Sequence, residues 1–229
     1  MPNYPQSDII RRFFTKGQPL ELNKGELVLS SASATDGVFY ISTGFVKIYS
    51  ISDAGEEYVH IVYGPGELFP LLATYLNFAT DSLFYEALSE TLVWRMSRDW
   101  FMRFIAGSIE ASNAMALQLA QQFQFFSERV DNLEYKKASE RVAYSLLFLA
   151  NRFGVRKGQS IVIEAPITHD LLASSVNLAR ESVSREFEKL ERENIVERAA
   201  HHIVITDVNR LTDKLSEPIG FVHWHLLQP

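Results

Sequence analysis

Residues 167–185, ITHDLLASSVNLARESVSR, decide the fold of the second half of this chain. Thr168 is a suitable N-cap for a first short helix, because its hydroxyl can accept from a free backbone N–H. Asn177 can supply the left-handed turn that ends this helix, a conformation that asparagine tolerates better than most residues. A second helix is predicted from Ala179 to about Glu193. Two helices joined in this way predict a helix-turn-helix motif.

A β-hairpin is predicted directly after this motif. Residues 195–198 and 202–205 are rich in β-branched side chains, as expected for two short strands. Ahead of the motif, residues 138–153 have the apolar period of a helix, and residues 161–163 read as a strand. Helix, strand, helix-turn-helix and hairpin together predict a winged helix-turn-helix domain over residues 137–210.

The second helix of the motif has two different faces. At about 100° per residue, its arginines and Glu181 fall on one polar arc, opposite Val183, Phe187 and Leu190. Arginine can pair with O6 and N7 of guanine, and glutamate can accept from N4 of cytosine, so this arc suits a G·C-containing site in the major groove. The alternative is an ordinary solvated helix face with Arg–Glu pairs. The candidate DNA-contacting residues are Arg180, Glu181, Ser184 and Arg185, with Thr168 and His169 beside them; Ser184 and His169 are expected at phosphates.

From about Lys24 to Trp94 the sequence predicts short strands separated by glycine turns. The spacing leaves no room for helices between the strands, which excludes a parallel α/β fold. We therefore predict an antiparallel β barrel or jelly roll over residues 1–107, and an α+β class for the whole chain. The predicted strands are residues 38–42, 45–49, 57–63, 83–85 and 91–96.

After Ser97 or Asp99, either of which can cap a helix, the apolar period changes from that of a strand to that of a helix. A long helix is predicted over residues 108–136, with the polar residues between 118 and 132 on its other face. Its apolar stripe indicates a dimer interface, and the alternative is that the helix lies on its own barrel. The stripe consists of Met115, Leu119, Phe123, Phe126, Val130 and Leu133.

The composition of the chain excludes several classes of protein and of site. It has 229 residues, a formal net charge of −6 and no cysteine, which excludes disulfides, a thiolate nucleophile and cysteine-held zinc or iron–sulfur clusters. Residues 1–136 are acidic, whereas residues 137–210 are almost neutral and tolerate a local basic face. The N-terminus is not a signal peptide, and no apolar run is long enough for a membrane span. We therefore expect a cytoplasmic protein.

The stretches 36–44 (DGVFYISTG), 64–69 (GPGELF) and 167–185 carry a family resemblance. From about residue 24 to residue 207 the chain resembles cAMP receptor proteins and fumarate–nitrate reduction regulators. The positions of Arg180, Glu181 and Arg185 match the residues with which the first type reads TGTGA-like half-sites. Those of Glu181, Ser184 and Arg185 match the residues with which the second type reads TTGAT, and both sequences contain TGA. The resemblance implies a homodimer on an inverted repeat in double-stranded DNA, which acts through RNA polymerase and is not an enzyme.

The resemblance also implies a sensor domain, but the chain departs from the family there. In the family that the chain resembles, a Glu holds the ribose of the cyclic nucleotide and an Arg holds its phosphate; an ungapped match of residues 69–88 puts Leu72 and Ser82 at these positions. Of two hydroxyl residues expected against the adenine, only Ser127 is present. We therefore expect no cAMP, but a small apolar or aromatic effector in a cavity; a filled core is the equal alternative. The candidate pocket residues are Leu71, Leu72, Ser82, Leu83, Phe123, Phe126 and Ser127.

The sequence offers few histidine ligands for haem or for a metal ion. His60 is the only histidine before residue 169, and a lone histidine within a strand indicates a structural role, so we expect no haem and no cupin-type metal site. His223 and His225 lie in a C-terminal extension, residues 211–229, without carboxylates at ligand spacing, so no zinc site is expected. The wing histidines at 201 and 202 are expected near phosphate, and Phe221 and Trp224 against a neighbouring domain. A constitutive DNA-binding protein, controlled by abundance or by a protein partner, remains the alternative function.

Overall fold

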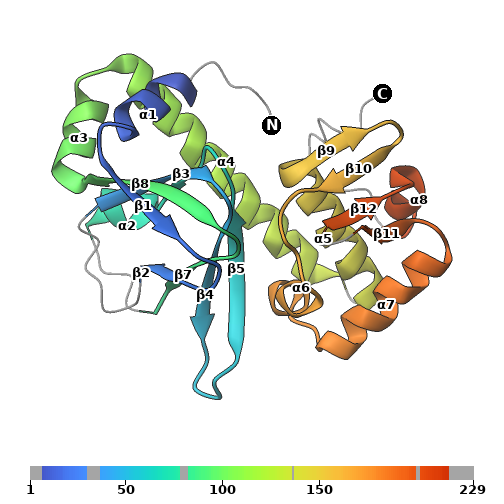
Figure 1. Ribbon diagram of the computed structural model, residues 1–229. Helices are drawn as coiled ribbons and strands as arrows, with labels where there is room; N and C mark the ends of the chain where they lie inside the picture. Colours follow the sequence, from blue (N-terminus) through green and yellow to red (C-terminus); the bar gives the residue numbers. More distant parts are fainter. Residues whose placement is uncertain (1–6, 30–36, 78–81, 136, 200–201, 217–229) are drawn as a thin grey trace. The chain divides into compact units, whose positions relative to one another are not determined.

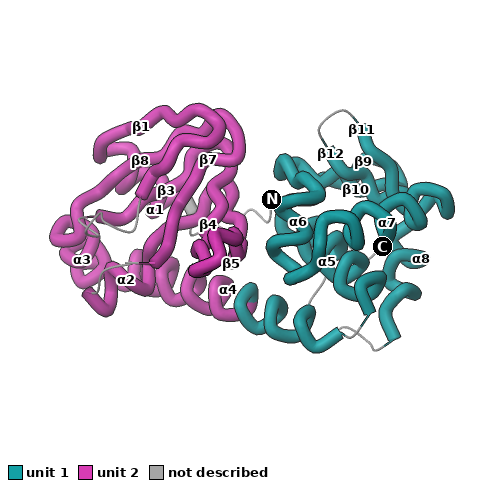
Figure 2. The backbone as a smooth tube through the Cα atoms, turned by 90° about the horizontal axis from the view of Figure 1, so that it is seen from below, with its two compact units in different colours: residues 1, 125–229 teal, residues 2–124 magenta. Residues whose placement is uncertain are grey.

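The computed structural model describes residues 7–29, 37–77, 82–135, 137–199 and 202–216. The chain forms two compact units, residues 2–124 and residues 125–229 (Figure 2). The 26-residue helix α4 (Ile109–Glu134) begins in the first unit and ends in the second. Within the described ranges, no helix is long and apolar enough to cross a membrane.

The first unit is a sandwich of two antiparallel sheets with helices at one side (Figure 1). The strand orders are β1-β8-β3-β6 in one sheet and β2-β7-β4-β5 in the other. The elements before α4 are α1 (Ser7–Phe14), β1 (Gln18–Leu22), β2 (Leu27–Leu29), β3 (Gly37–Thr43), β4 (Val46–Ile51), β5 (Glu57–Tyr63), β6 (Leu68–Phe69), α2 (Leu71–Leu76), β7 (Phe84–Ala87), β8 (Thr91–Ser97) and α3 (Arg98–Ala106).

The five strands predicted from the sequence are confirmed as β3, β4, β5, β7 and β8, and the cap of α3 is Ser97, whose hydroxyl accepts from the N–H of Trp100. Sequence reasoning missed α1, α2, β1, β2 and β6. The strands among them are short, two to five residues, and β1 (QPLEL) contains a proline and a glutamate. Such segments carry too few apolar positions to show a period.

Aromatic rings fill the space between the two sheets. Phe69 on β6 is fully buried, and its ring stacks on Phe39 of the neighbouring strand at 5.4 Å between centroids. From the opposite sheet, Tyr85 and Tyr63 stack on the same ring at 5.3 and 6.0 Å. All three ring pairs lie within 13° of parallel, and each tyrosine is almost completely buried. The sandwich interior at this level is therefore occupied by side chains.

The other face of β3 is covered by helices. Val38 and Tyr40 on this face pack with Phe14 of α1, Phe101 of α3 and Met115 of α4 in one buried cluster. Both faces of β3 are thus buried, which explains why its sequence is a continuous apolar run rather than an alternating one.

Two residues of the predicted dimer stripe belong to this cluster in their own chain. Met115 is 1% exposed within it, and Leu119 is partly buried against it. The prediction of a dimer contact is therefore wrong for Met115, because a side chain that its own domain encloses has no surface left for a partner. The first half of α4 follows the alternative, a helix lying on its own barrel.

The polar residues of α4 are not confined to a solvated face, contrary to the expectation for residues 118–132. Gln122 is buried and donates from Nε2 to the carbonyl of Leu68 at 2.8 Å. Near the end of the helix, Asn132 is buried and donates from Nδ2 to the hydroxyl of Ser145 on the next helix at 2.6 Å. These side chains face protein because each satisfies a polar group that packing would otherwise leave without a partner.

The second unit is a winged helix-turn-helix, as predicted. Helices α5, α6 and α7 pack on one another, and a four-stranded antiparallel sheet of order β11-β12-β10-β9 flanks them (Figure 1). Strand β9 and helix α8 were not predicted. The elements are α5 (Ala138–Phe153), β9 (Gly154–Lys157), β10 (Ser160–Ile163), α6 (His169–Val176), α7 (Arg180–Arg192), β11 (Val196–Ala199), β12 (His202–Ile205) and α8 (Val208–Thr212).

One arginine ties three segments of this unit together. The guanidinium of Arg141 on α5 donates to the carbonyls of Tyr135 at 2.7 Å, Leu133 at 3.2 Å and Val176 at 3.4 Å. Leu133 lies in the last turn of α4, Tyr135 follows that helix, and Val176 is the last residue of α6. The last turn of α4 is therefore joined to the helix-turn-helix motif through a single side chain.

Candidate nucleic-acid interface

The helix-turn-helix motif has the caps that its sequence predicts. The hydroxyl of Thr168 accepts from the N–H of Leu171 at 3.1 Å, which satisfies a free donor at the start of α6. Asn177 has φ 55° and ψ 52° and ends α6 in the left-handed conformation. Ala179 precedes α7 in an extended conformation, without a side-chain cap. The turn that orients the two helices is thus set by local residues.

The apolar face of α7 is anchored in the core of the second unit. Val183, Phe187 and Leu190 are buried, as their helical spacing predicts, and α7 packs on both α5 and α6. Arg180, Glu181 and Arg185 are exposed, and Ser184 is half-buried between the two faces. The anchored face leaves the polar arc on the surface, where its side chains can reach a groove of DNA.

Weak contacts hold the two arginines of the arc in the free protein. Nε of Arg180 lies 3.3 Å from a carboxylate oxygen of Asp170 on α6, and both side chains are 65% exposed. Nε of Arg185 donates to the carbonyl of Glu181 at 3.3 Å, and a terminal nitrogen donates to the hydroxyl of Ser182 at 3.3 Å. Exposed pairs of this kind contribute about 1 kcal/mol or less, so DNA can replace them.

His169 faces α7 rather than solvent. Its Nδ1 lies 2.9 Å from the hydroxyl oxygen of Ser184, and its ring packs on Phe187 at 5.0 Å between centroids. Nε2 is enclosed and has no hydrogen-bond partner among the described residues. Neither ring nitrogen is therefore available to a phosphate in this conformation, and the predicted phosphate contact of His169 is wrong here.

The surroundings of His169 keep its ring neutral. Burial lowers the pKa of His169 below its ordinary value, and the charges of Arg198 and Arg180 lower this pKa further. Asp170 and Glu188 act in the opposite direction but do not cancel the first effects. A histidine with a lowered pKa is uncharged at pH 7, so it contributes no positive charge to the interface.

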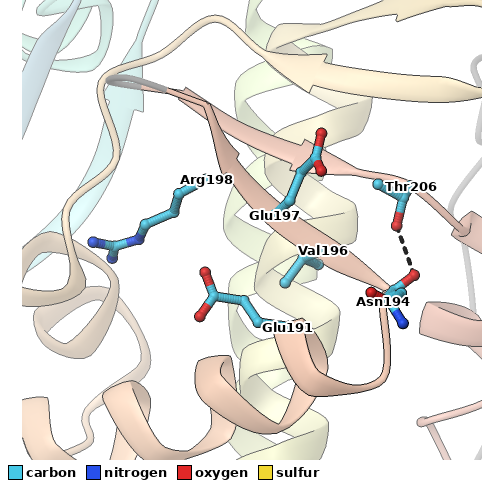
Figure 3. A pocket seen from close by; sticks show the side chains of 6 residues that line it. All are labelled: Glu191, Asn194, Val196, Glu197, Arg198 and Thr206. Carbon is cyan, nitrogen blue, oxygen red and sulfur yellow. Dashed lines mark hydrogen bonds between the residues drawn. The ribbon is translucent and has the colours of Figure 1, made fainter.

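Arg198 on β11 is a residue of this region that sequence reasoning missed. Its guanidinium lies over the ring of Phe187 at 5.2 Å, so it connects the wing to α7. In Figure 3 Arg198 and Glu197 extend in different directions from the strand, beside a cavity of about 340 Å³. Arg198 lines this cavity together with Glu191 and Glu197, so two carboxylates that would repel phosphate accompany its one positive charge. The cavity is therefore not a basic site for phosphate.

The residues predicted for an effector pocket differ widely in exposure. Leu71 is buried in the cluster beneath the helices, whereas Leu72 is 60% exposed, Ser82 is exposed and Leu83 is half-buried. Phe123 is 74% exposed, and Phe126 and Ser127 belong to the second compact unit. Of the two readings that the sequence left equal, the stacked rings between the sheets agree with the filled core.

Histidine and carboxylate groups suited to a cofactor are sparse in the described part of the chain. Nε2 of His60 lies 2.8 Å from the hydroxyl of Ser50 on the neighbouring strand. Within the described ranges, no group of three or more His, Asp or Glu side chains is arranged to hold a metal ion. His201 and the tail from residue 217 lie outside these ranges, so the predictions for His201, Phe221, His223, Trp224 and His225 stay predictions.

Comparison with known proteins identifies both halves of the chain. The pattern of the cyclic nucleotide-binding domain matches residues 19–108, and that of the Crp-like helix-turn-helix domain matches residues 140–214. A CRP-like cAMP-activated global transcriptional regulator of Mycobacterium tuberculosis is 25% identical over 194 residues, which cover 85% of this chain and 86% of the relative. The transcriptional activator protein FnrA of Stutzerimonas stutzeri is 24% identical over 217 residues, with coverage of 90% and 82%.

The fold agrees with this assignment. A solved structure of a CooA mutant from Carboxydothermus hydrogenoformans has a TM-score of 0.74 at 17% identity, and the match covers 93% of this chain and 96% of that one. Sandwich, long helix and winged helix-turn-helix thus occur here in the order found in these regulators, with an exposed polar arc on α7. The chain belongs to the Crp/Fnr family of DNA-binding transcription regulators, which are not enzymes.

Proposed function

We propose that this protein binds DNA as a homodimer and reads an inverted repeat whose half-sites contain TGA. In this proposal Arg180 and Arg185 pair with guanines, and Glu181 accepts from a cytosine N4 amino group. The observation that carries it is the division of α7 into an anchored apolar face and an exposed polar arc. In this proposal the protein is cytoplasmic and acts on transcription through RNA polymerase.

The second half of α4 supports the homodimer. Four apolar side chains at spacings of 3, 4 and 3 lie on one face of the helix and are exposed in the single chain: Phe123, Phe126, Val130 and Leu133. Such a stripe is costly in water and is typical of a helix that pairs with a second copy. A two-fold dimer presents two copies of α7, which is what an inverted repeat requires.

In our proposal the effector is not a cyclic nucleotide. Leu72 and Ser82 stand where the resemblance places a charged pair for ribose and phosphate, and both are exposed. The rings of Phe39, Phe69 and Tyr85 fill the space between the sheets. A buried phosphate needs charged or multiple donors, so these residues do not fit cAMP.

A second candidate function has specific support from the same rings. If the sandwich interior is a packed core, the protein binds DNA without a small molecule, and its abundance or a protein partner sets its activity. The near-parallel stack around Phe69 favours this candidate. An effector-gated protein would instead bind its ligand elsewhere, for example where α4 meets a second copy.

Selection of bound duplexes from a random DNA library by ligand-free protein tests the proposal. At about 0.15 M salt, where phosphate attraction is partly screened, an inverted repeat with a TGA core is expected. Arg180→Ala and Arg185→Ala should each relax one guanine position and cost about 1–3 kcal/mol there. An equal loss of affinity on every sequence would refute base reading by these arginines.

The same selection separates the two candidate functions. Enrichment by ligand-free protein supports constitutive binding, whereas enrichment only after addition of cell extract supports an obligatory effector. A small molecule that binds the folded state should also raise the melting temperature of the protein. Failure to enrich any sequence under both conditions would contradict the proposal itself.

A further inference from the structure

The contact between His169 and Ser184 joins the two helices of the helix-turn-helix motif. Nδ1 of His169, in the first turn of α6, lies 2.9 Å from the hydroxyl oxygen of Ser184, which is half-buried on the polar side of α7. Packing on Phe187 holds the ring in this orientation. Either group can donate in such a pair, and the choice decides what Ser184 offers to DNA.

The surroundings of the second ring nitrogen decide which group donates. If Ser184 donated to Nδ1, the neutral ring would carry its proton on Nε2, and this N–H would be buried without an acceptor among the described residues. Buried N–H groups without a partner are rarer than buried acceptors without one. This difference places the proton on Nδ1.

With the proton on Nδ1, the imidazole donates and the hydroxyl oxygen of Ser184 accepts. The hydroxyl hydrogen then points away from the ring, and no other hydrogen bond of the Ser184 side chain occurs among the described residues. We propose that Ser184 keeps its hydroxyl hydrogen free to donate to DNA, and that His169 is the positioning residue that leaves this hydrogen free. The inference rests on the proposed function, since it requires α7 to lie in the major groove.

A serine with a free hydroxyl hydrogen can bind hydrogen-bond acceptors. On the major-groove edge, guanine and thymine offer acceptors only, adenine offers the acceptor N7 and the donor N6, and cytosine offers its N4 amino donor. If Ser184 faces a base, it can therefore donate to guanine, thymine or adenine. A phosphate oxygen is the other possible acceptor, and in that case the identity of the base has no effect. The opposite tautomer would use the hydroxyl hydrogen on Nδ1 and leave Ser184 able only to accept, so that guanine and thymine could not bind it.

The tautomer can be measured directly on the full-length protein. Nitrogen-15 spectra of protein labelled on histidine rings distinguish a protonated Nδ1 from a protonated Nε2, and His169→Leu identifies the signal of His169. At pH 7.5 we expect Nδ1 protonated and Nε2 bare. A protonated Nε2 would overturn the proposal, whatever the DNA experiments show.

Binding experiments test the consequence for DNA. Ser184→Ala should lower affinity about three- to tenfold, the usual value of one hydrogen bond. If the loss occurs with guanine or thymine at one position, the acceptor is a base, and His169→Leu should reduce the preference for that base; a loss confined to cytosine would overturn the proposal. If the loss is equal on all sequences, the acceptor is a phosphate, and His169→Leu should lower affinity on every sequence. Ser182→Ala is the matched control, because Ser182 lies on the same helix and contacts Arg185 instead.

The remaining outcomes refute one claim or the other. No change of affinity in Ser184→Ala, while Arg180→Ala still relaxes a guanine, would overturn this inference and leave the proposed function intact. Wild-type behaviour of His169→Leu on all duplexes would overturn the positioning role. If the wild-type protein itself shows no sequence preference, the proposed function is contradicted.

Discussion

Replacement of Phe123 by glutamate tests whether α4 joins two copies of the chain. Phe123 is 74% exposed in the single chain, and a phenylalanine side chain has about 150–250 Å² to bury. At ~25 cal/mol per Å², covering the exposed part of a ring at the lower end of this range stabilises a dimer by about 3 kcal/mol per copy. A two-fold dimer contains the residue twice, so on this conservative area the limit is about 6 kcal/mol.

Half of this limit is a realistic expectation, because a helix seam covers only part of each ring. A loss of about 3 kcal/mol raises the dimer dissociation constant roughly 100-fold. Sedimentation equilibrium over a range of protein concentrations measures this constant. The carboxylate adds to the effect because pairing would bring two like charges together in a partly dehydrated seam.

A matched variant guards against a general effect of surface charge. Leu76→Glu places the same carboxylate on a side chain of α2 that is 65% exposed, away from the α4 stripe, and should leave the dissociation constant unchanged. Circular dichroism of Phe123→Glu should retain the helix content, since the residue contributes little to the core of its own chain. An unchanged dissociation constant in folded Phe123→Glu would refute the assignment of the stripe to a dimer interface.

Three further perturbations address the second unit. Phe187→Ala should lower the free energy of unfolding by about 3–5 kcal/mol, because the ring is fully buried; urea denaturation measures this, and a loss below 1 kcal/mol would contradict its role as anchor of α7. Asp170→Asn removes a carboxylate 3.3 Å from Arg180 and should raise affinity for nonspecific DNA at low salt with little change in stability; titration of a random duplex checks this, and weaker binding would argue against it. The lowered pKa of His169 means that the unfolded chain binds more protons as pH falls through about 6.5, so this residue makes stability decrease from pH 7.5 toward pH 5.5. His169→Leu should show a smaller decrease in melting temperature over this range, and an equal decrease would show that the pKa of His169 is not lowered by folding.

Local sequence signals predicted most of the helix-turn-helix motif. Thr168 caps α6 and Asn177 ends it, because capping and left-handed turns depend on the side chain of one residue and on its nearest neighbours. The bounds of α5 at residues 138 and 153 also agree with the apolar period. The exposure of Arg180 and Arg185 followed from the same period, since a helix that buries Val183 and Phe187 must turn these arginines outward.

Errors arose where a residue has two possible neighbours. The stripe of α4 is one continuous pattern, yet Met115 is enclosed by its own domain while Phe123 remains exposed. Both residues fit a helical seam equally well in sequence. The packing of α1 and α3 beside the sheet determines which part of the α4 stripe is buried within its own domain.

The sequence by itself determined the longer strands of the sandwich, the helices of the helix-turn-helix domain, the caps of the motif and the two faces of α7, because these follow from hydrophobic period and local hydrogen bonding. The tertiary structure alone decided that the sandwich interior is stacked with rings from both sheets, and that His169 is held against Ser184, fifteen residues further along the chain. Such contacts join segments that are remote in sequence, and their geometry depends on how whole elements pack. The same packing directs Nδ1 of His169 to the hydroxyl of Ser184 rather than to the predicted phosphate.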